Sequence, residues 1–367
     1  MQALISFFIF VFVLFLYIHV TSVWKKSEDL EIYEVDYTTH NALQEVVAIK
    51  QPVLFQLASH HSNFFTKMSL SKMAKYDNYD VNVKDLADYK KEDSVYSISL
   101  PMRTATKLMA TDTHARYVSE DNARFLEESG FDAVAHSLDT FLKPNFTVSR
   151  IYDFMYGSKH ACTPLKYHVD YQYYIVVNEG KIRMKMTPWK SSRILEPISD
   201  YENYEFRSLL NPWKPEERKR DYEKIRFLDF EVYAGSVLFV PAYWWYSICF
   251  SGETLNSLTI VRYNTGASVL ANLNHLGKYV LQQNNTKTKV AKTLPVSLDG
   301  GGIAAPETPS TQDNESDADK DAVLFEGRKS TNTEIVTNAG VYKTTGDLGE
   351  STYVDGTMSK KSIAESK

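Results

Sequence analysis

The stretch that decides the fold is GSVLFVPAYWWYSICF, residues 235–250. A glycine opens it, an apolar run follows, and Pro241 separates this run from a second, aromatic-rich one. Runs of β-branched and aromatic residues between turn residues are typical of buried strands. The stretch therefore predicts two strands joined by a turn. Trp244 and Trp245 are expected to pack in the core and at its rim, each with a partner for its indole N–H.

Segments of the same kind surround this stretch. Residues 147–265 contain short apolar runs separated by turn residues, as in a β-sandwich or barrel. Upstream, residues 31–37 alternate like a strand and short helical patterns follow, while residues 266–283 read as a helix. The sequence thus predicts a mostly β fold with flanking helices (α+β), a folded domain at 25–286 and a β core at 147–265.

The N-terminal segment is apolar and carries no charge over residues 3–24. About 20 such residues span a bilayer, so residues 1–24 are predicted to be a single-pass anchor whose partner is the lipid bilayer. A signal peptide cut after Ser22 is the alternative, although no basic region precedes the apolar run. Lys25 and Lys26 follow the run and favour a cytoplasmic location for the bulk of the chain. A lumenal or a virion membrane stays open.

Charge and cysteine content exclude several classes of protein. Beyond residue 290 there are 13 acidic and 8 basic residues, which accounts for the whole net charge of −5 and leaves the rest balanced. A balanced domain has no basic footprint for nucleic acid. Residues 287–367 are predicted to be a disordered acidic tail. Cys162 and Cys249 are the only cysteines, which fits neither a disulfide scaffold nor a zinc module. Asn-x-Ser/Thr triplets, which matter only in a lumenal domain, begin at Asn145, Asn284 and Asn314.

Two blocks of the sequence together resemble the cupin-like JmjC hydroxylases, a family that includes the asparaginyl hydroxylase of the hypoxia-inducible factor. The blocks are GSKHACTPLKYHVDYQYYIVVNEGKIRMKMTPW (157–189) and GSVLFVPAYWWYSI (235–248), and the resemblance spans residues 30–285. It implies a double-stranded β-helix, or jelly roll. It also implies a site in which two histidines and one carboxylate hold Fe(II) beside the co-substrate 2-oxoglutarate.

The metal-ligand positions implied by this resemblance are changed in this chain. Tyr246 stands where the family has its last histidine. Strict spacing from Gly157 puts Lys166 at the first histidine and His168 at the carboxylate, whereas a shift of two residues aligns His168 and Asp170 with the His-x-Asp pair. Neither count supplies the last histidine of the ligand set. A His-x-Asp pair in a strand is also a common hydrogen-bonded structural pair, and Tyr246 as a phenolate ligand of ferric iron is a further alternative.

The co-substrate positions implied by the resemblance are changed as well. Thr163 matches a residue that helps to bind 2-oxoglutarate in relatives, but the strand lysine that pairs with its distal carboxylate is Ile182 here. Lys181 and Arg183 are the candidate replacements if the protein is active. Because successive residues of a strand point to opposite faces, both are expected on the far side from Ile182.

The degenerate site comprises Lys166, His168, Asp170 and Tyr246. It predicts a membrane-anchored protein that has lost Fe(II)/2-oxoglutarate catalysis, needs no cofactor, and acts as a binding or structural module with a protein partner. We expect Lys166 to be buried and to pair with Asp170 and the Tyr246 hydroxyl, because a buried ammonium needs acceptors. The alternative is an active Fe(II)/2-oxoglutarate-dependent protein hydroxylase whose rearranged metal site uses His168 and Asp170. A third hypothesis is a lumenal cupin that binds a sugar or a lipid.

Overall fold

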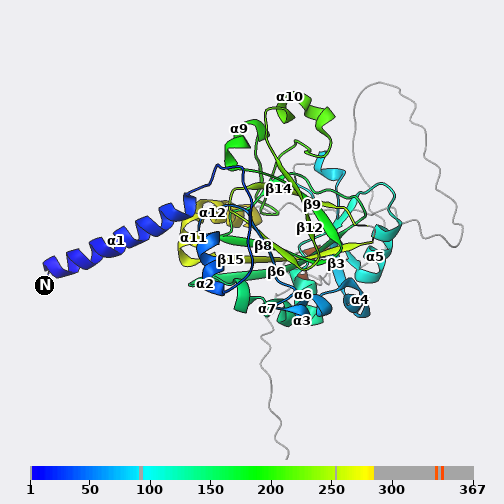
Figure 1. The fold of residues 1–367 in the computed structure, drawn as a ribbon, viewed down its shortest axis with the longest axis horizontal. Coiled ribbons are helices and arrows are strands. Elements are labelled where there is room, and N and C mark those ends of the chain that lie inside the picture. Colours follow the sequence, from blue (N-terminus) through cyan, green and yellow to red (C-terminus); the bar gives the residue numbers. More distant parts are fainter. Residues whose placement is uncertain (1, 91–93, 253, 285–334, 338–339, 343–367) are drawn as a thin grey trace, which may run out of the picture. The chain divides into compact units, whose positions relative to one another are not determined.

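The structure, a computed structural model drawn in Figure 1, belongs to the α+β class. It contains two mostly antiparallel sheets, several short helices, and one apolar helix at the N-terminus. The residues that the structure describes are 2–90, 94–252, 254–284, 335–337 and 340–342.

The larger sheet is built around three strands from the second half of the domain. These central strands are almost fully buried, which explains why their sequences read as continuous apolar runs rather than as alternating ones. All neighbouring strands are antiparallel except β1 and β2, which are parallel. In spatial order the strands are β1 (Tyr33–Glu34), β2 (Val53–Gln56), β13 (Ser236–Val240), β8 (Gln172–Glu179), β15 (Asn256–Thr265), β6 (Thr147–Gly157), β5 (Tyr117–Ser119), β3 (Asp80–Asp85) and β4 (Ile98–Pro101).

The smaller sheet is antiparallel throughout. Its strands β9 and β12 alternate between buried and more exposed residues, as expected when one face packs on the core and the other meets solvent. In spatial order the strands are β10 (Ile198–Asp200), β11 (Glu205–Arg207), β7 (Lys166–Tyr167), β14 (Trp245–Phe250), β9 (Lys181–Thr187) and β12 (Leu228–Tyr233).

The two sheets enclose one apolar core. Ile175, Leu238 and Ile260 reach it from the larger sheet, and Met184 and Ile248 reach it from the smaller one. Between β6 and β15 the chain passes back and forth between the sheets, so that β6, β8, β13 and β15 belong to one and β7, β9, β12 and β14 to the other. The expected β core at 147–265 is therefore found as two packed sheets.

The opposite face of the larger sheet is covered by helices from the N-terminal half of the domain (Figure 1). Tyr174 and Val176 point toward this second core, whereas their neighbour Ile175 points between the sheets, as the two-residue period of a strand requires. The helices that follow α1 are, in chain order, α2 (His40–Val47), α3 (Ser62–Lys67), α4 (Leu70–Met73), η1 (Ala74–Tyr76), η2 (Asp88–Lys90), α5 (Met102–Thr111), α6 (Ala123–Ser129), α7 (Asp132–His136), α8 (Asp139–Leu142), η3 (Trp189–Ser191), α9 (Ser192–Leu195), η4 (Pro215–Arg218), α10 (Lys219–Tyr222), α11 (Gly266–Ala271) and α12 (Leu273–Asn284). Those from α2 to α8, apart from η2, contribute residues to this second core.

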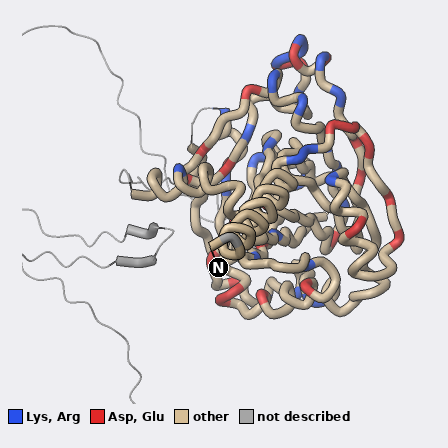
Figure 2. The backbone as a smooth tube through the Cα atoms, turned by 90° about the vertical axis from the view of Figure 1, so that its left-hand side faces the viewer, with Lys and Arg blue, Asp and Glu red and all other residues tan. Residues whose placement is uncertain are grey.

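Helix α1 (Gln2–Trp24) is long and apolar enough to cross a membrane, although a signal sequence satisfies the same test. Figure 2 shows no charged residue along it. Its C-terminal end is attached to the domain, because the Trp24 indole donates to the Ala271 carbonyl at 3.1 Å. The Lys50 ammonium donates to the carbonyls of Ser22 and Val23, at 2.6 and 3.0 Å, and so satisfies two of the free carbonyls at the helix end.

The C-terminal part of the chain forms a separate unit, Gly300–Lys367. Within it the structure describes only β16 (Ile335–Thr337) and β17 (Gly340–Tyr342), which pair with each other antiparallel. The rest of the expected disordered acidic tail at 287–367 lies outside the described residues.

Candidate functional site

The site predicted from the sequence lies where β7 meets β14. Lys166 and Tyr246 are directly paired across these two strands. Residues directly opposite in antiparallel strands project to the same face, and Tyr246 belongs to the core between the sheets. The pairing therefore puts Lys166, rather than His168, opposite Tyr246.

The tryptophan pair fixes the start of β14. Tyr243, in the turn before the pair, has a left-handed backbone with a φ of 65°, and its N–H donates to the His168 carbonyl at 2.9 Å. The Trp245 indole donates to the Ser192 hydroxyl at 2.8 Å on the side away from Tyr246. Trp244 is almost fully buried, and its indole N–H has no hydrogen-bond partner among the described residues. The expectation of a partner for each indole is thus wrong for Trp244.

Lys166 belongs to a buried charge cluster, which we define as Lys84, Tyr89, Glu120, Lys166 and Glu205. The Lys166 ammonium lies 2.7 Å from a Glu120 oxygen, and the Lys84 ammonium lies 3.0 Å from the other one. Lys84 also lies 3.4 Å from Glu205, whose carboxylate accepts from the Tyr89 hydroxyl at 3.1 Å. The side chains of both lysines and both glutamates are at most 12% exposed. The cluster joins the smaller sheet to the loop after β5.

The charges of this cluster hold one another in the ionised state. Burial alone would lower the pKa of Lys166, but the carboxylates of Glu120 and Glu205 outweigh it and raise that pKa above its usual range. Burial alone would raise the pKa of Glu120, but the ammonium groups of Lys166 and Lys84 hold it well below its usual range. At neutral pH the cluster is therefore a fixed set of charges rather than a proton donor or acceptor.

Lys84 has one more partner outside the cluster. Its ammonium lies 2.8 Å from the carboxylate of Asp121, whose side chain is 54% exposed. Two ammonium groups thus face three carboxylates, of which the third is partly solvated.

A second set of polar groups lies next to the cluster, between the sheets. The Tyr246 hydroxyl donates to that of Tyr173 at 3.1 Å, and the Tyr173 ring stacks on His168 with 4.3 Å between ring centroids. His168 Nε2 lies 3.1 Å from the Val240 carbonyl, which makes this nitrogen the protonated one in the neutral ring. Its Nδ1 is buried without a hydrogen-bond partner among the described residues. Burial, only partly opposed by Asp170, lowers the pKa of His168 to about 4, so the ring is neutral at pH 7.

Asp170 does not take the expected role. Its carboxylate accepts from the Asn264 amide at 2.6 Å and lies 4.0 Å from His168 Nδ1. The carboxylate that pairs with Lys166 is Glu120, so the expected Lys166–Asp170 pair is replaced by Lys166–Glu120. The Tyr246 hydroxyl is bonded to Tyr173 rather than to the ammonium.

The three candidate co-substrate residues do not gather around Lys166. The buried Thr163 hydroxyl accepts from the Ile248 N–H at 2.9 Å and so belongs to the backbone pairing beside β14. Lys181 and Arg183 lie on the outer face of β9, as expected, where they pair with Glu231 at 2.8 Å and Asp229 at 2.6 Å. Ile182, between them, is fully buried in the core.

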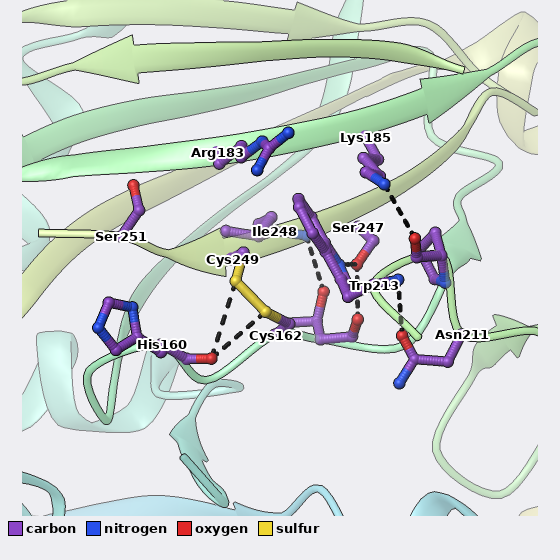
Figure 3. Close-up of a disulfide and its surroundings, with 12 residues drawn as sticks. His160, Cys162, Arg183, Lys185, Asn211, Trp213, Ser247, Ile248, Cys249 and Ser251 are labelled. Carbon is purple, nitrogen blue, oxygen red and sulfur yellow. Dashed lines mark hydrogen bonds between the residues drawn. A yellow bond between two sulfur atoms is a disulfide. The ribbon is translucent and has the colours of Figure 1, made fainter. Parts of the chain in front are cut away.

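The outer face of β14 carries a disulfide that the cysteine count did not predict. Cys162, in the segment before β7, is bonded to Cys249 of β14, with 4.0 Å between their Cα atoms (Figure 3). Cys249 is paired across the strands with Arg183, so the disulfide and Arg183 share one face of the smaller sheet.

No group of three or more His, Cys, Asp or Glu side chains within the described ranges is arranged to hold a metal ion. An open hollow of about 600 Å³ lies elsewhere, next to the turn between β8 and β9, with Leu70, Met102, Thr106 and Leu255 among its lining residues.

No protein-family model matches the sequence, and no curated protein is similar enough to it to count as a match.

No pattern in the sequence indicated Glu120, Lys84 or Glu205 as members of the site. They come from three segments far apart in the chain, after β5, in β3 and in β11. A carboxylate partner for a buried lysine could be anticipated in kind, but no local pattern identifies which carboxylate supplies it.

Proposed function

We propose that the protein is a membrane-anchored module of the cupin-like JmjC type that has lost Fe(II)/2-oxoglutarate catalysis and works as a binding or structural element. The observation that carries the proposal is the ion pair of Lys166 and Glu120 opposite Tyr246. By the strict spacing, two of the iron ligands of the family that the sequence resembles belong at the positions of Lys166 and Tyr246.

The strand order supports a double-stranded β-helix as the underlying fold. Eight strands, from β6 to β9 and from β12 to β15, are shared between two sheets in the orders β13-β8-β15-β6 and β7-β14-β9-β12. Strands of a jelly roll are distributed over two packed sheets in this way. The glycine turn, Pro241 and the tryptophan pair of residues 235–250 would then be kept because they form the turns and strands of this fold.

The chemistry of the side chains supports the loss of iron. An ammonium has three donors and no lone pair, so Lys166 cannot ligate a metal, and its charge repels a divalent cation in the same space. The pKa of Tyr246 is raised by burial, which disfavours the phenolate that a ferric ion would require. These side chains therefore favour the ammonium of Lys166, rather than a bound metal ion, as the cation at this site.

The first experiment measures metal content and turnover. We expect the purified full-length protein to contain no stoichiometric iron after exposure to Fe(II) under anaerobic conditions, and to consume no 2-oxoglutarate. One tightly bound Fe(II) per chain that disappears in a His168→Ala variant would overturn the proposal in favour of the hydroxylase alternative.

One observation favours that alternative. His168 Nδ1 is a buried lone pair without a hydrogen-bond partner among the described residues, and Asp170 lies 4.0 Å from it. A metal between them would use both groups. The Asn264 amide already holds Asp170, however, and no further ligand is arranged around the pair within the described residues.

A second experiment restores the ligand set that the resemblance implies. The variant combines Lys166→His, His168→Asp and Tyr246→His with Glu120→Gln, which removes the carboxylate left without its lysine. If the site is a vacated iron centre, this variant, once shown by circular dichroism to be folded, gains a Co(II) absorption spectrum that the wild type lacks. A folded variant that binds no more Co(II) than the wild type would show that the site never had this geometry.

A further inference from the structure

We propose that the folded domain lies on the oxidising, lumenal side of the membrane and that Asn145 carries an N-linked glycan there. This inference concerns the side of the membrane and a modification site, and it stands whether or not the protein binds iron. It reverses the cytoplasmic location that Lys25 and Lys26 favour in the sequence. Two observations that do not depend on each other carry it.

The first observation is that the fold brings the only two cysteines of the chain together. The backbone around them is hydrogen-bonded on both sides, from the Thr163 N–H to the Ile248 carbonyl at 2.8 Å and from the His160 N–H to the Phe250 carbonyl at 2.7 Å. Cys162 and Cys249 are therefore held opposite each other by strand pairing, and neither is fully buried. Such pairs are oxidised in secretory compartments and are rare in the reducing cytosol.

The second observation is that the triplet Asn145-Phe146-Thr147 lies in an exposed turn. It follows α8 and leads into β6, and the Asn145 side chain is exposed and makes no hydrogen bond with another described residue. Phe146, with a left-handed φ of 60°, is 90% exposed. A glycan on the preceding residue would lie beside this exposed ring.

Of the two basic residues that argue for the cytoplasm, Lys26 has other partners in the fold. The Lys26 ammonium lies over the rings of Trp189 and Tyr243, at 3.9 and 4.0 Å from their centroids. Cation–π contacts of this kind stabilise the domain against the end of α1. Long domains also cross a membrane largely regardless of the charges that flank the anchor. Lys26 is thus explained by packing, and the charges after α1 do not determine the orientation.

The test translates the full-length chain in the presence of endoplasmic-reticulum microsomes. Asn284→Gln and Asn314→Gln are introduced in every sample, so that Asn145 is the only remaining acceptor. We expect one step in electrophoretic mobility that a glycan-removing amidase reverses and that Asn145→Gln abolishes. Asn63→Gln is the matched control, because Asn63 is also exposed and followed by a phenylalanine but has Phe65 where the acceptor triplet needs Ser or Thr.

The same samples also show whether the two cysteines are bonded to each other. We expect no reaction with a maleimide reagent in denaturant until a reductant is added, which shows that Cys162 and Cys249 are paired. Free thiols without reductant, together with no glycan-dependent step, would overturn the proposal and return the domain to the cytoplasm. Paired cysteines with no step at Asn145 would overturn the glycan site.

Discussion

The two faces of the smaller sheet use the same chemistry in opposite surroundings. On the outer face, Arg183 pairs with Asp229, and their side chains are 50% and 31% exposed. On the inner side, Lys166 pairs with Glu120, and each side chain is 10% exposed. The distances between charged atoms, 2.6 and 2.7 Å, are nearly equal. The distance alone therefore does not distinguish an ion pair on which the stability of the fold depends from one that contributes little to it.

Burial makes the difference between them. An exposed pair exchanges water for a partner at little gain, and its long side chains lose freedom. A buried charge that loses its partner cannot regain water, so it destabilises the protein strongly. Removing one partner of the inner pair is thus expected to destabilise the fold strongly, whereas removing one partner of the outer pair should have little effect on stability.

The largest effect is expected for Lys166→Met. This change leaves Lys84 alone against Glu120, Glu205 and the partly exposed Asp121. Breaking a buried pair by removing one partner typically costs about 3–5 kcal/mol. We expect the free energy of unfolding in urea to fall by that amount at pH 7.

The matched control adds Glu120→Gln to the same chain. The amide oxygen can still accept from Lys84, and two carboxylates rather than three then face the one remaining ammonium. Most of the lost stability should return in this double variant. A Lys166→Met variant within about 1 kcal/mol of the wild type, which is the range of a surface pair, would contradict the comparison of the two faces.

The next effect concerns the dependence of stability on pH. Burial of the ring lowers the pKa of His168 from its usual value of 6.5 to about 4. A depressed folded pKa contributes stability that is complete above the unfolded pKa and is lost as the pH falls through the folded one. As the pH falls from 6.5 to 4, this histidine should therefore lower the free energy of unfolding by about 3 kcal/mol in total, at 1.36 kcal/mol per pKa unit.

Other groups titrate in the same window, so the measurement is a difference between two proteins. Burial and the neighbouring Asp121 raise the pKa of Asp153 to about 6, and this group contributes stability that is lost in the opposite direction, as the pH rises. The wild-type curve contains both slopes. Urea unfolding of wild type and His168→Gln from pH 7 to 4.5 should isolate the histidine, with the variant gaining relative to the wild type as the pH falls. Parallel curves would mean that His168 has the same pKa in the folded and the unfolded protein.

The coarse fold was predictable because its determinants are local. Strands between residues 147 and 265 are visible as apolar runs between turns, and they form the two sheets. Element ends were less predictable, since the helix expected at 266–283 is divided into α11 and α12 at Asn272. The strand expected at 31–37 is reduced to Tyr33–Glu34, because only these two residues pair with β2.

The site was predictable only on its own strands. Lys166 and Tyr246 could be placed by spacing along two neighbouring segments, and the strand pairing brings them together. Glu120 could not be identified, because its approach to Lys166 depends on where the fold places the loop after β5 relative to β7. The cysteine pair was missed for a similar reason, since the register that brings Cys162 to β14 is a tertiary feature that composition does not contain.

The smallest effect is expected for the outer pair, and it completes the comparison. Arg183→Ala removes the bond to Asp229 and a 5.7 Å contact with the Trp213 ring, but both charged groups remain in contact with water. A double-mutant cycle of Arg183→Ala and Asp229→Ala should give a coupling of about 0.2–1 kcal/mol, and less at high salt. The same cycle for Lys166 and Glu120 should give several-fold more and should be insensitive to salt, since no ion reaches the buried pair. Equal couplings on the two faces would mean that solvent reaches Lys166, and the site between the sheets would then be open rather than filled.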